Sequence, residues 1–141
     1  TFIGDNLGTA ARARTGTGMV IDGGIRDYER VDELKDFPVY CRGVHPSAIY
    51  DVTLVGVNIP IRIGNATVMP GDAVLGTREG LTFIPPQFVQ EVVEKSENTR
   101  FRDVFGKMRL AEGRYTSGDI DRSDWAPEIE ADFQAWAKTQ S

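Results

Sequence analysis

Two short stretches near the start of the chain combine residue types that could hold a metal ion and an anion. Gly4 to Leu7 places an acid, Asp5, at the predicted start of a helix, where free backbone N–H groups and the helix dipole favour a carboxylate or phosphate. Arg26 and Asp27 follow an apolar run, at the strand end where open α/β sheets bind ligands. One helix and one strand separate the two stretches, so the chain can return them to one crevice. Such a crevice suits an anionic substrate with Mg²⁺, which typically takes one or two carboxylates and keeps several waters.

Local pattern alone favours a simpler interpretation of the same residues. Asp5 or Asn6 would cap the helix, since Asp and Asn are strong N-caps. Arg26 and Asp27 would then form a solvated pair at the start of the next helix. From these residues alone, both interpretations stay open.

The elements that must position these residues alternate between helix and strand over the first forty positions. Small residues favour the first helix, Gly16 and Gly18 end it, and Gly23-Gly24 is expected to form a tight turn. The predicted elements are a helix over 5–15, a buried strand over 19–21, a helix over 27–34 and a strand over 39–42. This order predicts an α/β layer.

The rest of the chain divides into a β-rich middle and a helical end. Short apolar pieces between glycines predict strands at 49–54, 57–63, 66–69, 73–76 and 81–84. A long helix is predicted from 84–86 to about 110, with a break, followed by a loop over 112–119. A last amphipathic helix over 123–138 carries a packing stripe of Trp125, Phe133 and Trp136.

Composition narrows the classes of function. The 141 residues suffice for one domain with a core, and the net charge of −5 argues against a nucleic-acid partner. Cys41 is the one cysteine, which favours a reducing compartment, and we predict a cytoplasmic protein. No apolar run reaches the roughly 20 residues of a membrane span, so no membrane partner is expected.

The stretch "GDNLGTAARARTGTGMVIDGGIRD" resembles the signature of the RraA-like family. This family includes 4-hydroxy-4-methyl-2-oxoglutarate aldolases, oxaloacetate decarboxylases and the regulator of ribonuclease activity A. The β region "GVNIPIRIGNATVMPGDAVLGTREGLTFIPP" and the tail "EGRYTSGDIDRSDWAPEIEADFQAW" are also similar to family members. The resemblance implies an α/β fold of the swivelling β/β/α type. Residues 1–141 would form a single RraA-like domain, the C-terminal portion of a longer family chain, with 112–141 as a C-terminal extension.

The resemblance also implies partners. Family members assemble as homotrimers or homohexamers, with sites near subunit boundaries. Because family chains begin upstream of Thr1, we expect the N-terminal part of the fold to be missing from this chain. A companion N-terminal fragment would then supply it.

The resemblance assigns a role to each candidate site residue. Asp27 would bind a divalent cation, Mg²⁺ or Mn²⁺, directly, and Asp5 would hold metal-bound water. Arg26 would bind the keto oxygen of a 2-keto acid. The substrate carboxylate would lie on the backbone of the first helical turn, formed by Gly4, Asp5, Asn6 and Leu7.

The implied activity is that of a class II, metal-dependent lyase of the aldolase or decarboxylase type. It would cleave a C–C bond of a pyruvate-derived 2-keto acid through an enolate that the metal and Arg26 stabilise. In the aldol direction Asp5, acting through water, is our candidate base, whereas oxaloacetate decarboxylation needs none. The alternatives are a protein-binding regulator of a ribonuclease and a hydratase or isomerase of related chemistry.

Four other residues have chemistry of their own, and structural roles are favoured for all of them. An N-terminal threonine can act as a nucleophile, but no partner residue for that role is evident for Thr1. His45, the one histidine, lies in a predicted loop, and Cys41 is expected to be a small core residue. Asp72 follows Pro-Gly and is expected to close a turn, although an acid here could also approach the site of a neighbouring subunit. Neither a dinucleotide fingerprint nor a Walker lysine accompanies the glycines near Met19.

Overall fold

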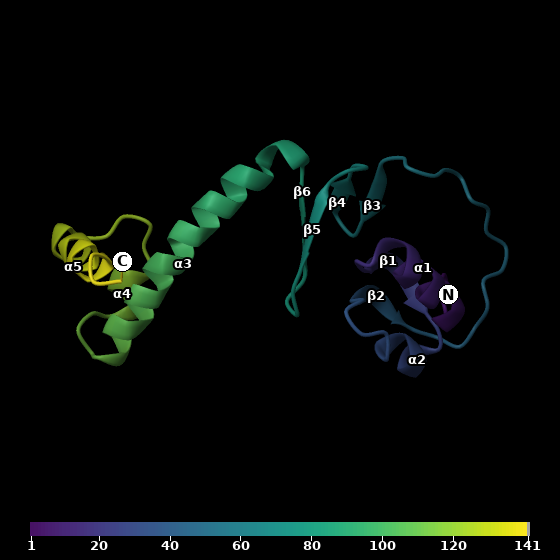
Figure 1. Cartoon of the computed structure of the whole chain (residues 1–141), viewed down its shortest axis with the longest axis horizontal. Helices are drawn as coiled ribbons and strands as arrows, with labels where there is room; N and C mark the ends of the chain where they lie inside the picture. The colour runs from purple at the N-terminus through teal and green to yellow at the C-terminus, as the bar shows by residue number, and fades with distance from the viewer. Residues whose placement is uncertain (141) are drawn as a thin grey trace. The chain divides into compact units, whose positions relative to one another are not determined.

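Two groups of elements make up the computed structural model, which describes residues 1–140 (Figure 1). Unit 1 spans Thr1–Pro86 and unit 2 spans Gln87–Ser141, and each is described by itself. None of the helices in the described residues is both long and apolar enough to cross a membrane.

Unit 1 begins with the predicted alternation of helices and strands. Its first elements are α1 (Asp5–Thr15), β1 (Met19–Ile25), α2 (Tyr28–Asp32) and β2 (Val39–Val44). The strands β1 and β2 are parallel. Gly16 ends α1 in the left-handed conformation, with φ of 64°, as the sequence predicts.

Strand β1 is longer than predicted, because Gly23 and Gly24 continue it instead of forming a tight turn. The pairing with β2 shifts register between Ile21 and Gly24, which is the irregularity that glycines in a strand often mark. The strand therefore ends at Ile25, directly before Arg26. The core beneath it consists of Ile3, Ile25 and Val31, with Met19, Ile21, Val39 and Cys41 packed against them.

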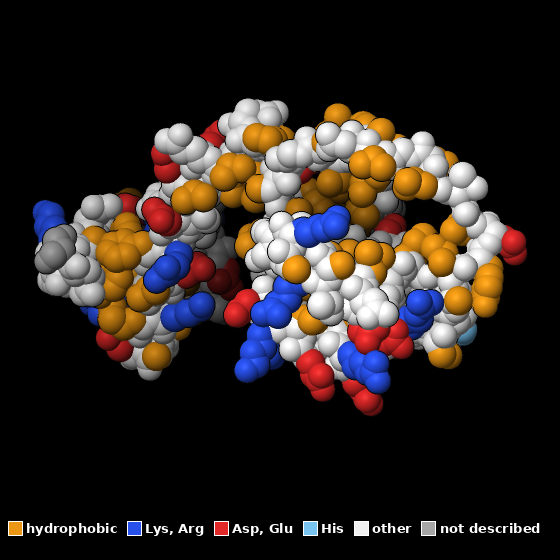
Figure 2. Space-filling view, turned by 45° about the vertical axis from the view of Figure 1, so that its right-hand side comes forward, with side chains coloured by type: hydrophobic (Ala, Val, Ile, Leu, Met, Phe, Trp, Pro, Cys, Tyr) orange, Lys and Arg blue, Asp and Glu red, His pale blue; other side chains and the backbone are white. Residues whose placement is uncertain are grey.

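Two antiparallel hairpins complete unit 1. They are formed by β3 (Ile61–Ile63) with β4 (Ala66–Val68), and by β5 (Ala73–Gly76) with β6 (Leu81–Ile84). The strand predicted at 49–54 is absent: this segment has no regular structure. Its apolar side chains are exposed, Tyr50 at 75% and Leu54 at 79%, and Figure 2 shows hydrophobic side chains along the irregular connection between β2 and β3. A strand needs a neighbour for its backbone, and the described residues supply none here.

Unit 2 is helical. The 3₁₀ turn η1 (Pro86–Phe88) begins at the last residue of unit 1 and ends in unit 2, which also contains α3 (Val89–Ala111), α4 (Ser117–Ile120) and α5 (Pro127–Ala137). The predicted break in the long helix does not occur, because α3 runs without interruption. The predicted loop over 112–119 contains the start of α4, where Thr116 and Asp119 form a reciprocal capping box.

The core of unit 2 is aromatic. Phe105 is completely buried, and Ile129 and Phe133 of α5 are 4% and 6% exposed. Trp125 and Trp136 pack against this cluster, and the indole N–H of Trp125 donates to the Ile120 carbonyl at 2.9 Å. The predicted stripe is therefore confirmed as a packing surface.

Candidate functional site

The two predicted site stretches, Gly4-Asp5 and Arg26-Asp27, follow two backbone segments that run parallel and end at the same edge of the sheet. Ile3 pairs in parallel with Ile25, the last residue of β1. The Arg26 N–H donates to the Ile3 carbonyl at 2.9 Å, and the Phe2 N–H donates to Gly24 at the same distance. Adjacent parallel segments end on one side of a sheet, which is where ligands bind in such folds. Gly4-Asp5 and Arg26-Asp27 therefore emerge side by side.

Gly4 lies at the centre of this arrangement. It is buried, and a β-carbon built on it would lie 2.5 Å from Oδ2 of Asp27 and 3.0 Å from Nε of Arg26. The backbone of Gly4 is extended, so the glycine is required for close approach and not for its conformation. The start of α1 thus sits directly against the Arg26–Asp27 pair.

Asp27 has a carboxylate that does not cap its own helix. It is the N-cap residue of α2, but its side chain accepts no capping hydrogen bond. Its backbone is left-handed, with φ of 54°, a conformation that Asp tolerates better than most residues. Oδ2 lies 3.5 Å from Nε of Arg26, and the two side chains are 43% and 40% exposed. The carboxylate therefore remains open to a ligand.

Asp5 is held by two hydrogen bonds at the first turn of α1. Its Oδ1 accepts from the Asn6 N–H at 2.8 Å, and its Oδ2 accepts from Nη1 of Arg30 at 3.1 Å. The hydrogen bond from Arg30 is the largest cause that holds the pKa of Asp5 below its usual value, and the bond from Asn6 adds to it. Desolvation opposes both. Asp5 is accordingly an ionised hydrogen-bond acceptor across the physiological range.

The predicted cap of α1 was wrong by one residue. Gly4 is the N-cap, Asp5 is the first helical residue, and no side chain caps this helix end. The side chains of Asn6 and Leu7 are exposed, so these residues would contribute to an anion site through their backbone. The N–H of Asn6 is already donated to Asp5.

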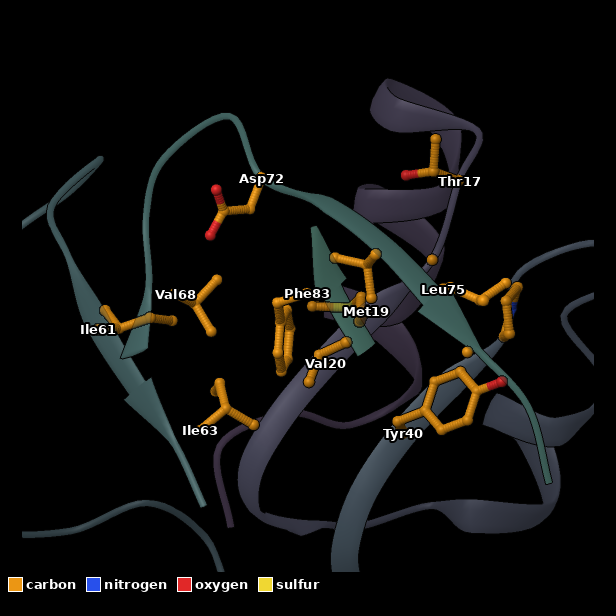
Figure 3. A pocket seen from close by; sticks show the side chains of 14 residues that line it. Thr17, Met19, Val20, Tyr40, Ile61, Ile63, Val68, Asp72, Leu75 and Phe83 are labelled. Atoms are coloured by element: carbon orange, nitrogen blue, oxygen red, sulfur yellow. The ribbon is translucent and has the colours of Figure 1, made fainter. Parts of the chain in front are cut away.

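Two acids are present at this edge, not a complete ligand cage. The described residues contain no group of three or more His, Cys, Asp or Glu side chains arranged to hold a metal ion. A large apolar cavity of about 720 Å³ lies elsewhere in unit 1, between Met19 and Val20 of β1 and Phe83 of β6 (Figure 3). Asp72 is the one acid on its wall.

The other residues with chemistry of their own occupy structural positions. The Thr1 hydroxyl donates to the Ser47 carbonyl, and His45 accepts from the Ser47 N–H at 3.1 Å in an exposed loop. Cys41 is half-buried in β2 against the core. Asp72 closes its turn by accepting from the Met69 N–H at 2.8 Å. These are the roles that the sequence favours.

Sequence reasoning missed two charged contacts near the site. Arg30, which binds Asp5, follows Asp27 by three residues, the spacing of one helical turn, and this spacing could have drawn attention to it. Asp22 of β1 pairs with Arg42 of β2 and also accepts from the Gly64 N–H at 2.9 Å. The second contact joins the turn between β3 and β4 to the first sheet, and no local pattern indicates it.

Comparison with known families agrees with the signature at this edge. The RraA-like family model, described as Aldolase/RraA, matches residues 1–83, which include Asp5, Arg26 and Asp27. The chain belongs to the RraA-like family. The RraA-like match covers nearly all of unit 1, from Thr1 to Phe83 in β6.

Named relatives of this RraA-like chain include one with an aldolase name. A protein of Halalkalibacterium halodurans named "Putative 4-hydroxy-4-methyl-2-oxoglutarate aldolase" is 34% identical over 86 residues, which are 61% of this chain and 40% of that protein. The chain spans less than half the length of this relative.

Solved structures place the RraA-like chain in the same fold. Streptomyces coelicolor RraAS2, an unusual member of the RNase ES inhibitor RraA protein family, has a TM-score of 0.70 and 31% identity, over 77% of this chain and 55% of that one. A protein from Pseudomonas syringae pv. tomato has a TM-score of 0.74 and 28% identity, over 86% and 60%. The α/β fold of the RraA-like type is therefore confirmed.

Proposed function

We propose that this protein is a divalent-metal-dependent lyase that cleaves a C–C bond of a pyruvate-derived 2-keto acid, by retro-aldol cleavage, oxaloacetate decarboxylation or both. The observation that carries the proposal is the close approach of the Arg26–Asp27 pair to Gly4, the residue directly before Asp5, where a side chain would collide with the pair. The aldolase name of a 34% identical relative supports the same chemistry.

The residues at this edge fit a small hard cation. Asp27 offers a carboxylate that no capping bond occupies, and Asp5 stays ionised. Mg²⁺ prefers oxygen ligands and usually keeps several waters, so two acids suffice for it, and Mn²⁺ takes the same ligands. Asp27 would hold the ion directly, and Asp5 would accept hydrogen bonds from its waters. When bound, such a cation supplies Lewis-acid polarisation of the keto acid oxygens.

Arg26 would stabilise the negative charge that develops during cleavage. As the bond between C3 and C4 breaks, its electron pair delocalises onto the keto oxygen. The Arg26 guanidinium is permanently cationic, and its position beside Asp27 is set by the end of β1 before any substrate binds. Preorganised charge of this kind acts on the transition state without reorganisation.

Asp5 would serve chiefly as a hydrogen-bond acceptor. In the aldol direction the C4 hydroxyl must lose a proton, and Asp5, acting through a bound water, is the proposed base. Because the Arg30 and Asn6 contacts lower its pKa, Asp5 is a weak base. Decarboxylation of oxaloacetate reaches the same enolate without that proton transfer. We therefore expect decarboxylation to be the more robust of the two activities.

A metal-dependence assay tests the proposal. Pyruvate release is measured from oxaloacetate and from 4-hydroxy-4-methyl-2-oxoglutarate with Mg²⁺ or Mn²⁺, and again with EDTA. Asp27→Asn should remove the metal-dependent rate, while the control Asp103→Asn, at an exposed position of α3, should not. Equal rates in the wild type, Asp27→Asn and buffer with metal would refute the proposal.

A regulator of a ribonuclease is the second candidate. It is favoured by the 31% identity to RraAS2, whose family inhibits RNase ES. The same scaffold can serve both roles, because function follows the site and not the fold. Co-purification with purified ribonuclease distinguishes them: a stoichiometric complex without pyruvate release favours the regulator.

The assembly and the domain organisation are further proposals. We propose a homotrimer or homohexamer with sites near subunit boundaries. We also propose that residues 1–141 act as one RraA-like domain with 112–141 as an extension. Light scattering of the purified protein measures the number of subunits, and its intact mass measures the length of the chain.

A further inference from the structure

The two acids of the candidate site are matched by two arginines. Arg26 lies beside Asp27, with 3.5 Å between Nε and Oδ2, and Arg30 binds Asp5, with 3.1 Å between Nη1 and Oδ2. The formal charges of the four side chains cancel. A divalent cation that enters alone must therefore approach two carboxylates whose charge is already compensated.

Arg30 is bonded to both acidic residues: its side chain donates to the Asp5 carboxylate, and its backbone N–H donates to the Asp27 carbonyl at 3.1 Å. Its pKa is raised first by its hydrogen bond to Asp5, then by the charges of Asp5 and of Asp27. The guanidinium reaches Asp5 from α2, the helix that Asp27 begins, so one short helix carries the proposed metal ligand and this second cation. Arg30 is thus placed to influence whatever binds between the two acids.

Arg30 also has donors to spare. A guanidinium has five N–H donors, and among the described residues the Arg30 side chain makes one hydrogen bond, to Asp5. Its side chain is 76% exposed, whereas that of Asp5 is 24% exposed. Most of the Arg30 side chain is therefore accessible to an anion that arrives from solvent. Arg30 can therefore oppose a cation and attract an anion at the same site.

We propose that Arg30 couples metal binding to substrate binding, by opposing a divalent cation that arrives alone and stabilising one that arrives with a dianionic 2-keto acid. This inference rests on the proposed function and adds a positioning residue to it. Such coupling is a free energy between two ligands, and it is reciprocal. Its consequence is that substrate should tighten metal binding, and that Arg30 should carry part of this effect.

Titration calorimetry on the whole chain tests the coupling without turnover. Mn²⁺ is the cation, and oxalate, a dianion that cannot be cleaved, stands for the substrate. In Arg30→Gln, Mn²⁺ alone should bind about three- to tenfold more tightly, and oxalate at saturating Mn²⁺ should bind about three- to tenfold more weakly, as expected for an exposed charge. Arg30→Lys, which keeps the charge, should lie near the wild type.

A matched variant separates the effect of Arg30 from the effect of a change in net charge. Arg14→Gln removes the same charge from the last turn of α1 and should leave both affinities unchanged. The inference is overturned if Arg30→Gln leaves both constants as in the wild type, if it weakens both, or if Arg14→Gln reproduces its effects. Loss of fold would weaken both, so opposite shifts cannot arise from misfolding.

The same titrations separate this inference from the proposed function. If the wild type and Asp27→Asn bind Mn²⁺ equally weakly, the proposed function fails, and the role of Arg30 falls with it. If the wild type binds Mn²⁺, Asp27→Asn does not, and Arg30→Gln matches the wild type, only the role of Arg30 is overturned.

Discussion

A β-carbon on Gly4 would lie 2.5 Å from Oδ2 of Asp27, closer than two such atoms can approach. The distance is short because Ile3 and Ile25 pair in parallel, so the chain starts α1 where β1 ends. The absence of a side chain at position 4 is therefore what lets the Asp27 carboxylate occupy its place.

Gly4→Ala should displace the Asp27 carboxylate without unfolding the chain, since the backbone of Gly4 has a conformation that alanine adopts. We expect Mn²⁺ affinity to fall by about tenfold or more, with near-normal circular dichroism, because a misplaced ligand costs on the order of 10–100-fold. Gly43→Ala is the control, because a β-carbon there meets nothing within 4 Å. Unchanged Mn²⁺ affinity in Gly4→Ala would contradict the proposed metal position.

Arg26→Ala should lower kcat for pyruvate release by about 10²–10³-fold, the usual effect of removing one preorganised donor. Arg26→Lys should restore part of the rate, because the charge remains while the planar fork is lost. Steady-state kinetics with oxaloacetate measure both variants. A rate in Arg26→Ala equal to that of the wild type would remove Arg26 from the mechanism.

Asp22→Ala should loosen the turn between β3 and β4. The Asp22 carboxylate accepts from the Gly64 N–H at 2.9 Å and pairs with Arg42, and these contacts also lower its pKa. Hydrogen exchange at the Gly64 amide should become faster in the variant, while the Met69 amide, held by Asp72, should be unaffected. Equal protection of Gly64 in both proteins would show that Asp22 does not hold this turn.

Asp132→Ala should destabilise unit 2. The Asp132 carboxylate accepts from Nε and Nη2 of Arg109, both at 2.8 Å, and from the Tyr115 hydroxyl at 3.1 Å, and its side chain is only 10% exposed. Loss of hydrogen bonds to a charged group should lower the free energy of unfolding by about 1.5–3 kcal/mol. Chemical denaturation followed by tryptophan fluorescence measures it, with Asp103→Ala as the exposed control.

The contribution of Asp132 should also depend on pH. The hydrogen bonds from Arg109 are the main cause that holds the pKa of Asp132 below its usual value, so the carboxylate binds its proton less readily in the folded state. The stabilisation is therefore fully present above about pH 4 and is lost as pH falls through the lowered pKa. Wild type and Asp132→Ala should converge in stability at low pH. A constant difference down to pH 2 would contradict this assignment.

The alternation of elements in unit 1 could be predicted because its signals are local. Small residues favour α1, Gly16 ends it, and the apolar run from Met19 indicates β1. The same local reasoning failed at Gly23-Gly24, where pairing with β2 outweighs the turn preference of glycine. It failed again at 49–54, because apolar composition predicts a strand but does not show whether a neighbouring strand is present to pair with it.

The residues of the candidate site could be selected from the sequence, but their contacts could not. Arg26 and Asp27 stand out because they follow an apolar strand, whereas the parallel pairing of Ile3 with Ile25 is a long-range contact. The hydrogen bond from Arg30 to Asp5 joins two helices and depends on how they pack. The metal-binding and substrate-binding roles of these residues remain predictions, as does the cytoplasmic location.

Every charged group of the candidate site lies within residues 5–30, at the ends of two parallel segments and the first turns of two helices. Loops and hairpins downstream can thus gain, lose or exchange residues without altering the spacing of these charges. A protein built in this way can acquire a new substrate preference through changes in its loops and hairpins while the charged residues of the candidate site stay the same.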